Sequence, residues 1–356
     1  MKKMKNLLST LGGLLIVLTI GLTWTACEKE SDESEIHVWA YDRDYTLCLY
    51  RDNILLKKYN KGETASGDSY NYSVGKDNSL IKYEIDKSKS KINIYKDSKL
   101  VSICQYEKNS LYTNTILSYR SVFFEKKDTY VMGFAEHYET SDTCYEMILW
   151  RNNEIIWKQL YTANHKFWRD WNGFGIAGSD IYWLVEELLG GNDTEYFLYK
   201  NGEIIKTYTS SLDILYLQVL DEDIYIYGYY YHGGKVWRND ELIFENYEHD
   251  PMSIRELTVI DGDWYLSGGL GNSGMGRVLK DGEVLYDFSI EKDSIYHYPI
   301  TIQGVSKYGS DIYCYGTYCP RKGGPIIERG AIWKNGEKYL FYQPEEVQSI
   351  LSVFKK

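Results

Sequence analysis

A short phrase recurs seven times along the chain: a large apolar residue, then Lys or Arg, then Asn or Asp, then a turn residue. The seven copies occupy residues 50–53, 95–98, 150–153, 199–202, 237–240, 279–282 and 333–336. Each copy lies between two runs of strand-forming residues. Asn-Gly and Asp-Gly in such a place favour a type I′ turn, because both tolerate a positive φ. We therefore expect each copy to be the tip of a β-hairpin.

A second phrase, Asp-x-Tyr, precedes most of these hairpins. It occupies residues 128–130, 180–182, 223–225, 263–265 and 311–313. In four of the five copies a glycine follows three residues after the Tyr, at positions 133, 228, 268 and 316. A glycine inside a strand usually indicates close packing or a bend. A short apolar run lies further upstream, so one repeat unit contains four strands.

The repeat predicts an all-β, seven-bladed β-propeller. The Asn/Asp positions are 38 residues apart between Asn201 and Asn239 and 55 apart between Asp97 and Asn152. Four-stranded units of about 40–50 residues are typical of propeller blades, and an open solenoid or a large sandwich is the alternative. The second repeat, around 79–95, lacks a clean Asp-x-Tyr phrase, so a count of six stays open.

The two chain ends are expected to share one blade. Residues 35–40 match the Asp-x-Tyr strand but have no apolar first strand before them, whereas the tail 349–356, SILSVFKK, resembles SVFFEKK at 121–127. Pairing the tail beside residues 35–39 would close the ring and leave no free inner edge. The repeat pattern of residues 35–356 resembles kelch-like propellers with Trp-Lys-Asn-Gly repeats, although most repeats lack the kelch double glycine. Such a resemblance implies a fold and not a ligand.

Composition agrees with a β-rich chain of one folded domain. The chain has 36 Tyr and 10 Trp but only 5 Pro, so strand-forming residues are many and strand breakers few. At 44% hydrophobic residues it can bury a core. No internal linker is visible, and we assign residues 35–356 to a single propeller domain.

The N-terminus has the features of a secretory leader. Lys2, Lys3 and Lys5 precede the apolar run 7–22, and the sequence Trp-Thr-Ala-Cys follows at 24–27. This resembles the lipobox of bacterial lipoproteins, with Trp where Leu is preferred. The resemblance implies a signal peptide over 1–26 and a lipid on Cys27. The alternatives are ordinary cleavage that leaves a free Cys27, or retention as one membrane span.

The acidic segment after Cys27 predicts a tether over 27–34 and a location in the cell envelope, anchored to the outer membrane. It resembles the surface-export signal of some Gram-negative lipoproteins, but a linker would have the same composition. Removal of 1–26 takes away three lysines and no acid, which moves the formal charge from −11 to −14. We therefore expect membrane association through the lipid, no nucleic-acid partner, and a monomer.

The five remaining cysteines do not form a recognisable disulfide framework or metal site. They are Cys48, Cys104, Cys144, Cys314 and Cys319, with no CxxC and no His at metal-ligand spacing. Cys314 and Cys319 are close enough in sequence to pair, and buried free thiols are the alternative. No cofactor is expected.

Candidate ligand-binding residues lie in the segments that do not repeat. In a propeller, the loops between second and third strands share one face with the connections between blades, and these segments vary in length here. Trp168, Arg169, Asp170 and Trp171 resemble a sugar-binding platform of aromatic rings and polar groups. Tyr229, Tyr231 and His232 form the second candidate, in which strand alternation lets only part of the run face a ligand. The alternative for His232 is a solvated loop residue. The alternative for the tryptophans is packing between blades.

The predicted function is binding of a glycan or an envelope protein, with no catalytic residue assigned. The alternative is a propeller glycoside hydrolase or lyase, which would need two loop carboxylates across the scissile bond. The candidate acids are Glu136, Glu139, Asp142, Glu186, Glu187 and Asp193. The repeated Asp221, Asp223, Asp261 and Asp263 are interpreted as turn formers rather than calcium ligands.

Overall fold

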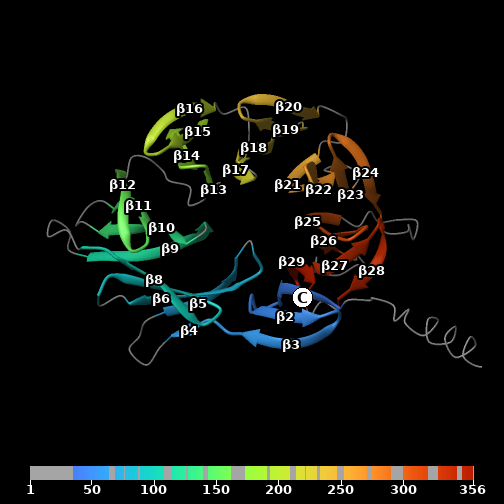
Figure 1. Cartoon of the computed structure of the whole chain (residues 1–356), viewed down its shortest axis with the longest axis horizontal. Helices are drawn as coiled ribbons and strands as arrows, with labels where there is room; N and C mark the ends of the chain where they lie inside the picture. Colours follow the sequence, from blue (N-terminus) through green and yellow to red (C-terminus); the bar gives the residue numbers. More distant parts are fainter. Residues whose placement is uncertain are drawn as a thin grey trace, which may run out of the picture. The chain divides into compact units, whose positions relative to one another are not determined.

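The computed structural model describes residues 35–63, 69–75, 77–86, 89–107, 114–125, 127–138, 143–161, 173–190, 193–208, 214–220, 222–230, 233–246, 252–270, 274–289, 300–319, 328–342 and 347–355. In these residues the chain is all-β, and its strands form seven sheets (Figure 1). Residues His37–Phe354 make up one compact unit, and the description below concerns that unit. No helix in the described part of the chain is long and apolar enough to cross a bilayer.

Each sheet is one propeller blade, and its strands run in order from the inner to the outer edge. Blade 1 contains β29 (Ser349–Lys355), β1 (Ile36–Tyr41), β2 (Leu47–Arg51) and β3 (Ile54–Tyr59). Blade 2 contains β4 (Gly62–Glu63), β5 (Ser69–Val74), β6 (Leu80–Asp86), β7 (Lys91–Lys96) and β8 (Lys99–Gln105). Blade 3 contains β9 (Asn114–Glu125), β10 (Asp128–Tyr138), β11 (Thr143–Arg151) and β12 (Glu154–Tyr161). Blade 4 contains β13 (Phe174–Ala177), β14 (Asp180–Gly190), β15 (Asp193–Lys200) and β16 (Glu203–Tyr208).

The last three blades have the same four-stranded order. Blade 5 contains β17 (Ile214–Leu220), β18 (Asp223–Tyr230), β19 (Gly233–Arg238) and β20 (Glu241–Asn246). Blade 6 contains β21 (Met252–Ile260), β22 (Asp263–Leu270), β23 (Gly276–Lys280) and β24 (Glu283–Phe288). Blade 7 contains β25 (Ile300–Tyr308), β26 (Asp311–Tyr318), β27 (Arg329–Lys334) and β28 (Glu337–Phe341).

Two expectations about this architecture are confirmed. The second repeat forms a complete blade, so the number of blades is seven and not six. The tail strand β29 pairs with β1 and supplies the inner strand that the N-terminal repeat lacks. Blade 7 holds the tail in place as well, since the Ser306 and Tyr308 hydroxyls donate hydrogen bonds to the Val353 carbonyl at 3.0 and 2.8 Å.

The seven copies of the turn phrase lie at the tips of the hairpins that join the two outermost strands of each blade. In blade 2, which has the additional short strand β4, these are β7 and β8. In six of the seven copies two successive residues have a positive φ, for example Asn201 at 52° and Gly202 at 97°, as a type I′ turn requires. Just after the turn, every outer strand carries a β-bulge, where one extra residue enters the ladder. A bulge twists an edge strand and makes edge-to-edge pairing with another chain harder.

The glycines that follow the Asp-x-Tyr phrase lie where the inner strand of the blade comes close to the second strand. A Cβ on Gly268 or Gly316 would come within 2.0 Å of the carbonyl oxygen of Ser253 or Thr301. The same contact at Gly133 would be 2.4 Å, to the Ser118 oxygen. These glycines are therefore required by strand packing, as the sequence predicted.

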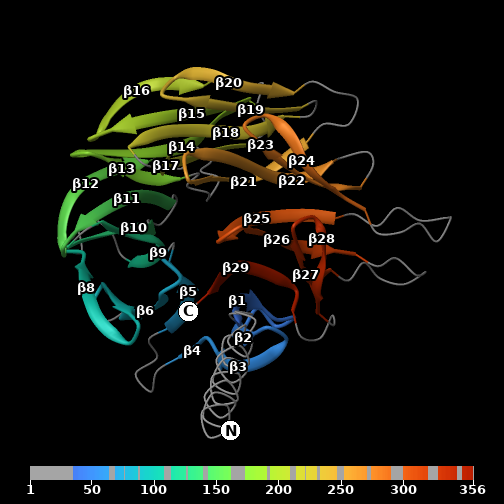
Figure 2. The ribbon, with the colours of Figure 1, turned by 45° about the vertical axis from the view of Figure 1, so that its right-hand side comes forward.

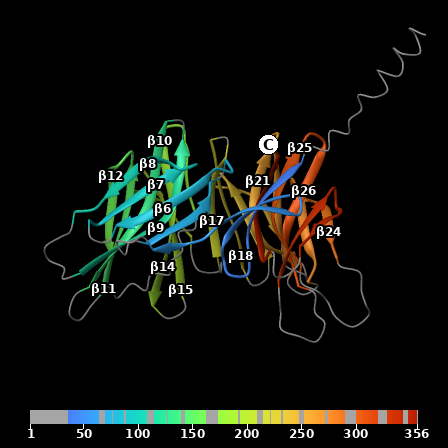
Figure 3. The ribbon, with the colours of Figure 1, turned by 90° about the horizontal axis from the view of Figure 1, so that it is seen from below.

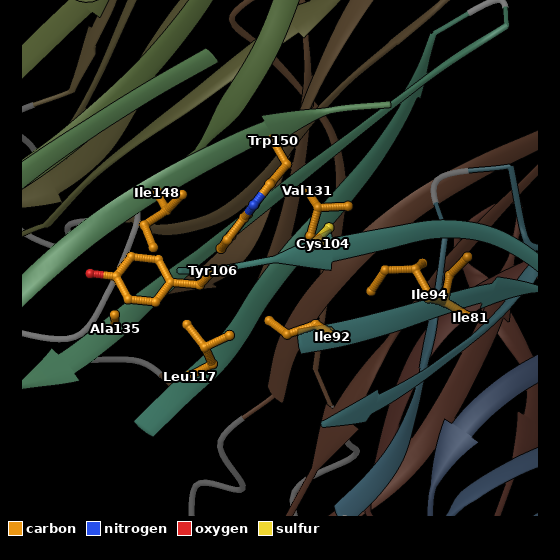
Figure 4. Packing of buried hydrophobic residues seen from close by; sticks show 10 residues of the cluster. All are labelled: Ile81, Ile92, Ile94, Cys104, Tyr106, Leu117, Val131, Ala135, Ile148 and Trp150. Carbon is orange, nitrogen blue, oxygen red and sulfur yellow. The ribbon is translucent and has the colours of Figure 1, made fainter. Parts of the chain in front are cut away.

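The hydrophobic core lies between neighbouring blades. The blades stand next to one another around the ring (Figure 2). The cluster between blades 2 and 3 includes Ile92, Ile94, Val131 and the fully buried Trp150 (Figure 4), and similar clusters lie between the other neighbours. The large apolar residue of the turn phrase, which is Trp150 in blade 3, is buried in this core. The phrase thus combines a turn with a contact between blades.

The strands run between two faces, which we name by their connections (Figure 3). The turn face carries the turns from first to second and from third to fourth strands. The connection face carries the links from second to third strands and from one blade to the next.

Candidate functional site

The polar side chains of the turn face bond to one another. In blade 4, the Asn201 amide donates to Asp180 at 2.7 Å, and its oxygen accepts a hydrogen bond from the Ile181 backbone N–H at 2.8 Å. The Lys200 ammonium lies 2.7 Å from the Asp180 carboxylate and 5.6 Å from the centre of the Tyr182 ring. We call this arrangement of Asp, Tyr, basic residue and Asn the turn clasp.

The turn clasp recurs in blades 3, 4, 5 and 7, and in blade 6 Asp281 takes the place of the Asn and accepts a hydrogen bond from the Trp264 N–H at 3.0 Å. The paired Asp and basic residues are Asp128–Arg151, Asp180–Lys200, Asp223–Arg238, Asp263–Lys280 and Asp311–Lys334. In blade 4, the hydrogen bonds from Lys200 and Asn201 lower the pKa of Asp180 below its ordinary value. The two sequence phrases are thus two halves of one structural device. In the described residues, this device engages the Asp and the basic residue of each of these turns.

Most of the predicted site residues lie outside the described residues: Cys27, Trp168, Arg169, Asp170, Trp171, Tyr231 and His232. Tyr229 lies in β18, opposite Ile214 and Gly234, at the end of the strand that reaches the connection face. For the remaining candidates, the structure fixes the strands on either side. Residues 162–172 join the end of β12 to the start of β13, and both of these strand ends belong to the connection face.

Long hairpins flank that segment in sequence. Strands β10 and β14 each have 11 residues, and β9 has 12, whereas most second strands have 8 or fewer. The extra residues lie at the connection-face end, where β10 pairs with β11 as far as Tyr138 and β14 pairs with β15 as far as Gly190. The second strands of blades 3 and 4 are therefore the longest, and their extra residues lie on the connection face, to which residues 162–172 are attached.

A buried polar network lies at the base of the blade 3 hairpin, against blade 2. His137 is fully buried, and its Nδ1 and Nε2 atoms lie 3.1 Å from the Thr115 hydroxyl and 3.2 Å from the Tyr106 hydroxyl. Tyr106 donates a hydrogen bond to Glu146 at 2.7 Å, and Lys158 lies 3.3 Å from the other Glu146 oxygen. The network thus joins blade 2 to four strands of blade 3.

Hydrogen-bond directions in the network define the state of His137. The single Tyr106 proton goes to Glu146, so Tyr106 can only accept from His137, and Nε2 carries the imidazole proton. Nδ1 then accepts from Thr115. Burial lowers the pKa of His137 below its ordinary value, although the neighbouring Glu146 opposes this shift. The sequence does not predict this network, because none of the residues in the network belongs to a repeated phrase.

In blade 3, Glu136 and Glu146 do not form a carboxylate pair on one face. Glu146 pairs with Ala135 and Tyr145 with Glu136, so Glu136 and Glu146 project from opposite faces of the blade. Glu146 is also engaged by Tyr106 and Lys158. In blade 4, Glu186 lies opposite Tyr196, Glu187 opposite Glu195, and Asp193 opposite Gly190. Glu139 and Asp142 lie outside the described residues. No group of three or more His, Cys, Asp or Glu in the described chain is placed to hold a metal.

The described cysteines are free thiols. Cys314 and Cys319 are both buried and do not form a disulfide, which answers the question that the sequence left open. Burial raises the pKa of the Cys314 thiol to about 12. Cys314 is therefore a packing residue and not a nucleophile.

Comparison with known proteins shows the fold and no family. No protein-family model matches the chain, and neither does any curated protein. The β-propeller domain of the Trilobed protease from Pyrococcus furiosus is similar over 87% of this chain and 97% of its own, with 12% identity and a TM-score of 0.42. The Pyrococcus horikoshii acylaminoacyl peptidase has the same identity and TM-score over 83% of this chain, which spans about half (51%) of that enzyme. The polysaccharide lyase Uly1 is similar over 61% of this chain and 57% of its own, at 9% identity and a TM-score of 0.36.

Proposed function

We propose that this chain is a lipid-anchored binding protein of the bacterial cell envelope. It is held to the outer membrane through Cys27, and it binds a glycan or an envelope protein partner on the connection face of blades 3 and 4. The seven-bladed propeller is the scaffold for this function. The anchor, the kelch-like character of the repeats and the ligand class belong to our proposal.

One observation carries the choice of face. On the turn face, the recurring Asp and basic residues of blades 3 to 7 are engaged with each other. The connection face, in contrast, carries the two long hairpins and the attachment points of residues 162–172. Aromatic and polar residues at 168–171 have the chemistry to cover sugar rings and bond their hydroxyls.

In blade 3, the geometry of the described acids provides no carboxylate pair for hydrolysis. Glu136 and Glu146 face away from each other, and Glu146 is already engaged. An enzyme would need acids from the remaining loop positions, such as Asp142 and Asp193. The hydrolase or lyase function is therefore kept as the alternative that the experiment decides.

The test is a glycan array probed with a soluble form that starts at Glu28. The expected result is binding that Trp168→Ala weakens and Trp168→Phe largely retains, because Phe keeps an aromatic face. Both variants should unfold at the temperature of the parent. A lower unfolding temperature with no array signal in any form would mean that Trp168 packs in the core. Turnover of a polysaccharide that Asp142→Asn or Asp193→Asn abolishes would establish the enzyme instead.

The anchor is tested separately. Cys27→Ala in the full chain should release the protein from the membrane fraction, because a lipid on Cys27 is the attachment that we propose. Unchanged fractionation of this variant would refute the anchor.

A further inference from the structure

The outer strand of blade 1 presents an unusual surface. Ile54, Leu55 and Leu56 follow one another in β3 with exposed fractions of 55%, 42% and 44%. Leu56 is the extra residue of the bulge, where strict alternation is broken, and the equivalent bulges leave Ile155–Ile156 and Ile204–Ile205 exposed as well. The feature peculiar to β3 is the third apolar residue, Ile54, at the position where β12 and β16 have a glutamate. The outer edge of β3 has no strand partner among the described residues. Three consecutive exposed apolar side chains on a free edge are a feature that soluble proteins normally avoid.

Basic residues follow the apolar run directly. Lys57 and Lys58 belong to the same strand, and Lys61 comes three residues later. The Lys57 ammonium lies 4.9 Å from the Tyr59 ring centre, and Lys58 bonds to Asp42 at 3.0 Å. The whole chain has a formal charge of −11, so an apolar run followed by three lysines is a local cluster of positive charge in an acidic protein. Apolar side chains next to lysines suit the boundary between acyl chains and phosphate headgroups.

Blade 1 is also the blade that the tether reaches first. From Cys27 to Ile36, where β1 begins, the chain has nine residue steps, which span at most about 30 Å when extended. Strand β3 is two strands away from β1 in the same sheet, or about 10 Å at the usual strand spacing. The tether is therefore short enough for β3 to contact the surface in which the anchor is embedded.

We propose that the outer strand of blade 1 docks on the lipid surface that holds the anchor, with Ile54, Leu55 and Leu56 at the level of the headgroups and the lysines beside the phosphates. This inference rests on the proposed lipid at Cys27. Docking through β3 would fix the orientation of the propeller on the membrane.

The experiment places a fluorescent probe on the strand and a matched probe on another blade. The full lipidated chain, in a Cys144→Ser background that removes the one partly exposed thiol of the described residues, carries Leu55→Cys or Ile204→Cys, each labelled with an environment-sensitive dye. Ile204 occupies the same register position in β16 of blade 4 and is 52% exposed. Both proteins are reconstituted in vesicles of phosphatidylethanolamine and phosphatidylglycerol that contain a nitroxide lipid.

The expected result is a shift to shorter emission wavelength and a loss of intensity for the dye at 55, with neither change at 204. If the chain floats with the vesicles but the dye at 55 behaves like the dye at 204, the docking inference is wrong while the anchor stands. If the full chain does not float, or Cys27→Ala floats equally well, the anchor itself fails. Quenching of both dyes to the same extent would also overturn the inference, because it would show contact without preference for blade 1.

Discussion

The turn clasp makes a quantitative prediction at Asn239. This residue has φ of 48°, its oxygen accepts a hydrogen bond from the Ile224 N–H at 2.9 Å, and its amide donates to Asp223 at 2.6 Å. The hydrogen bonds of the side chain and its tolerance of a positive φ can therefore be tested separately. Asn239→Gly removes both hydrogen bonds but accepts the positive φ, whereas Asn239→Ala removes the bonds and strains the turn.

The expected costs follow from these contacts. Two side-chain hydrogen bonds at an exposed position together contribute about 1–2 kcal/mol to the free energy of unfolding. An alanine in the left-handed region adds about 1–2 kcal/mol. Asn239→Ala should thus destabilise the protein by about 2–4 kcal/mol, and Asn239→Gly by about 1 kcal/mol less.

Urea unfolding followed by tryptophan fluorescence measures both variants. The midpoints should fall in the order parent, Gly, Ala at an unchanged denaturant slope. Asn53→Ala is the control, because Asn53 lies in the equivalent turn of blade 1 but has neither a positive φ nor a side-chain hydrogen bond in the described structure, and its effect should stay within about 0.5 kcal/mol. Equal costs for Gly and Ala at position 239 would refute the conformational part of the reasoning. Costs below that of the control would refute the clasp.

Two further predictions concern the core and the buried histidine. Gly268→Ala should prevent accumulation of folded protein or lower its unfolding temperature sharply, whereas Gly262→Ala, at a glycine with open space but φ of 87°, should cost only about 1–2 kcal/mol, as read by thermal unfolding. Equal losses of stability in the two variants would show that the close contact between position 268 and the Ser253 carbonyl does not determine the cost. Because burial lowers the pKa of His137, the folded chain binds fewer protons than the unfolded chain below about pH 6.5, so stability should fall as the pH drops from 7 to 5. His137→Gln should show a smaller fall over that range, and an unchanged slope would contradict the assignment.

The sequence predicted the parts of the fold that repeat, since each phrase must meet the same requirement in every blade. The Asp, Tyr and Asn positions recur because one turn must be closed in the same way each time. Blade 2 shows the limit of this reasoning. There the Leu80 N–H donates to Asp97 at 2.9 Å, as in other clasps, but the partner of Lys96 is Asp77, two residues before the usual place. The device is retained while its sequence phrase is lost.

The candidate site was less predictable, because its residues occur once. Tyr106, His137 and Glu146 come from three separate segments and share no spacing that a single sequence reveals. Only their placement in the fold brings them together. Loop length leads us to propose the connection face for binding, whereas the buried network between blades 2 and 3 follows from no sequence pattern.

The contact between the tail strand β29 and blade 7 has one part that the sequence predicts and one part that it does not. The tail strand could be predicted because SILSVFKK resembles an inner strand, yet the bonds that hold it are specific to this place. Ser306 and Tyr308 both donate to the Val353 carbonyl, and Tyr342 donates to the Asp52 carbonyl at 2.6 Å. The chain runs from β28 of blade 7 into β29 of blade 1, so it joins these two blades as it joins the others. Within blade 1, however, β29 and β1 are joined only by the pairing of the strands. We therefore expect the ring to open first between β29 and β1, with β29 remaining attached to blade 7.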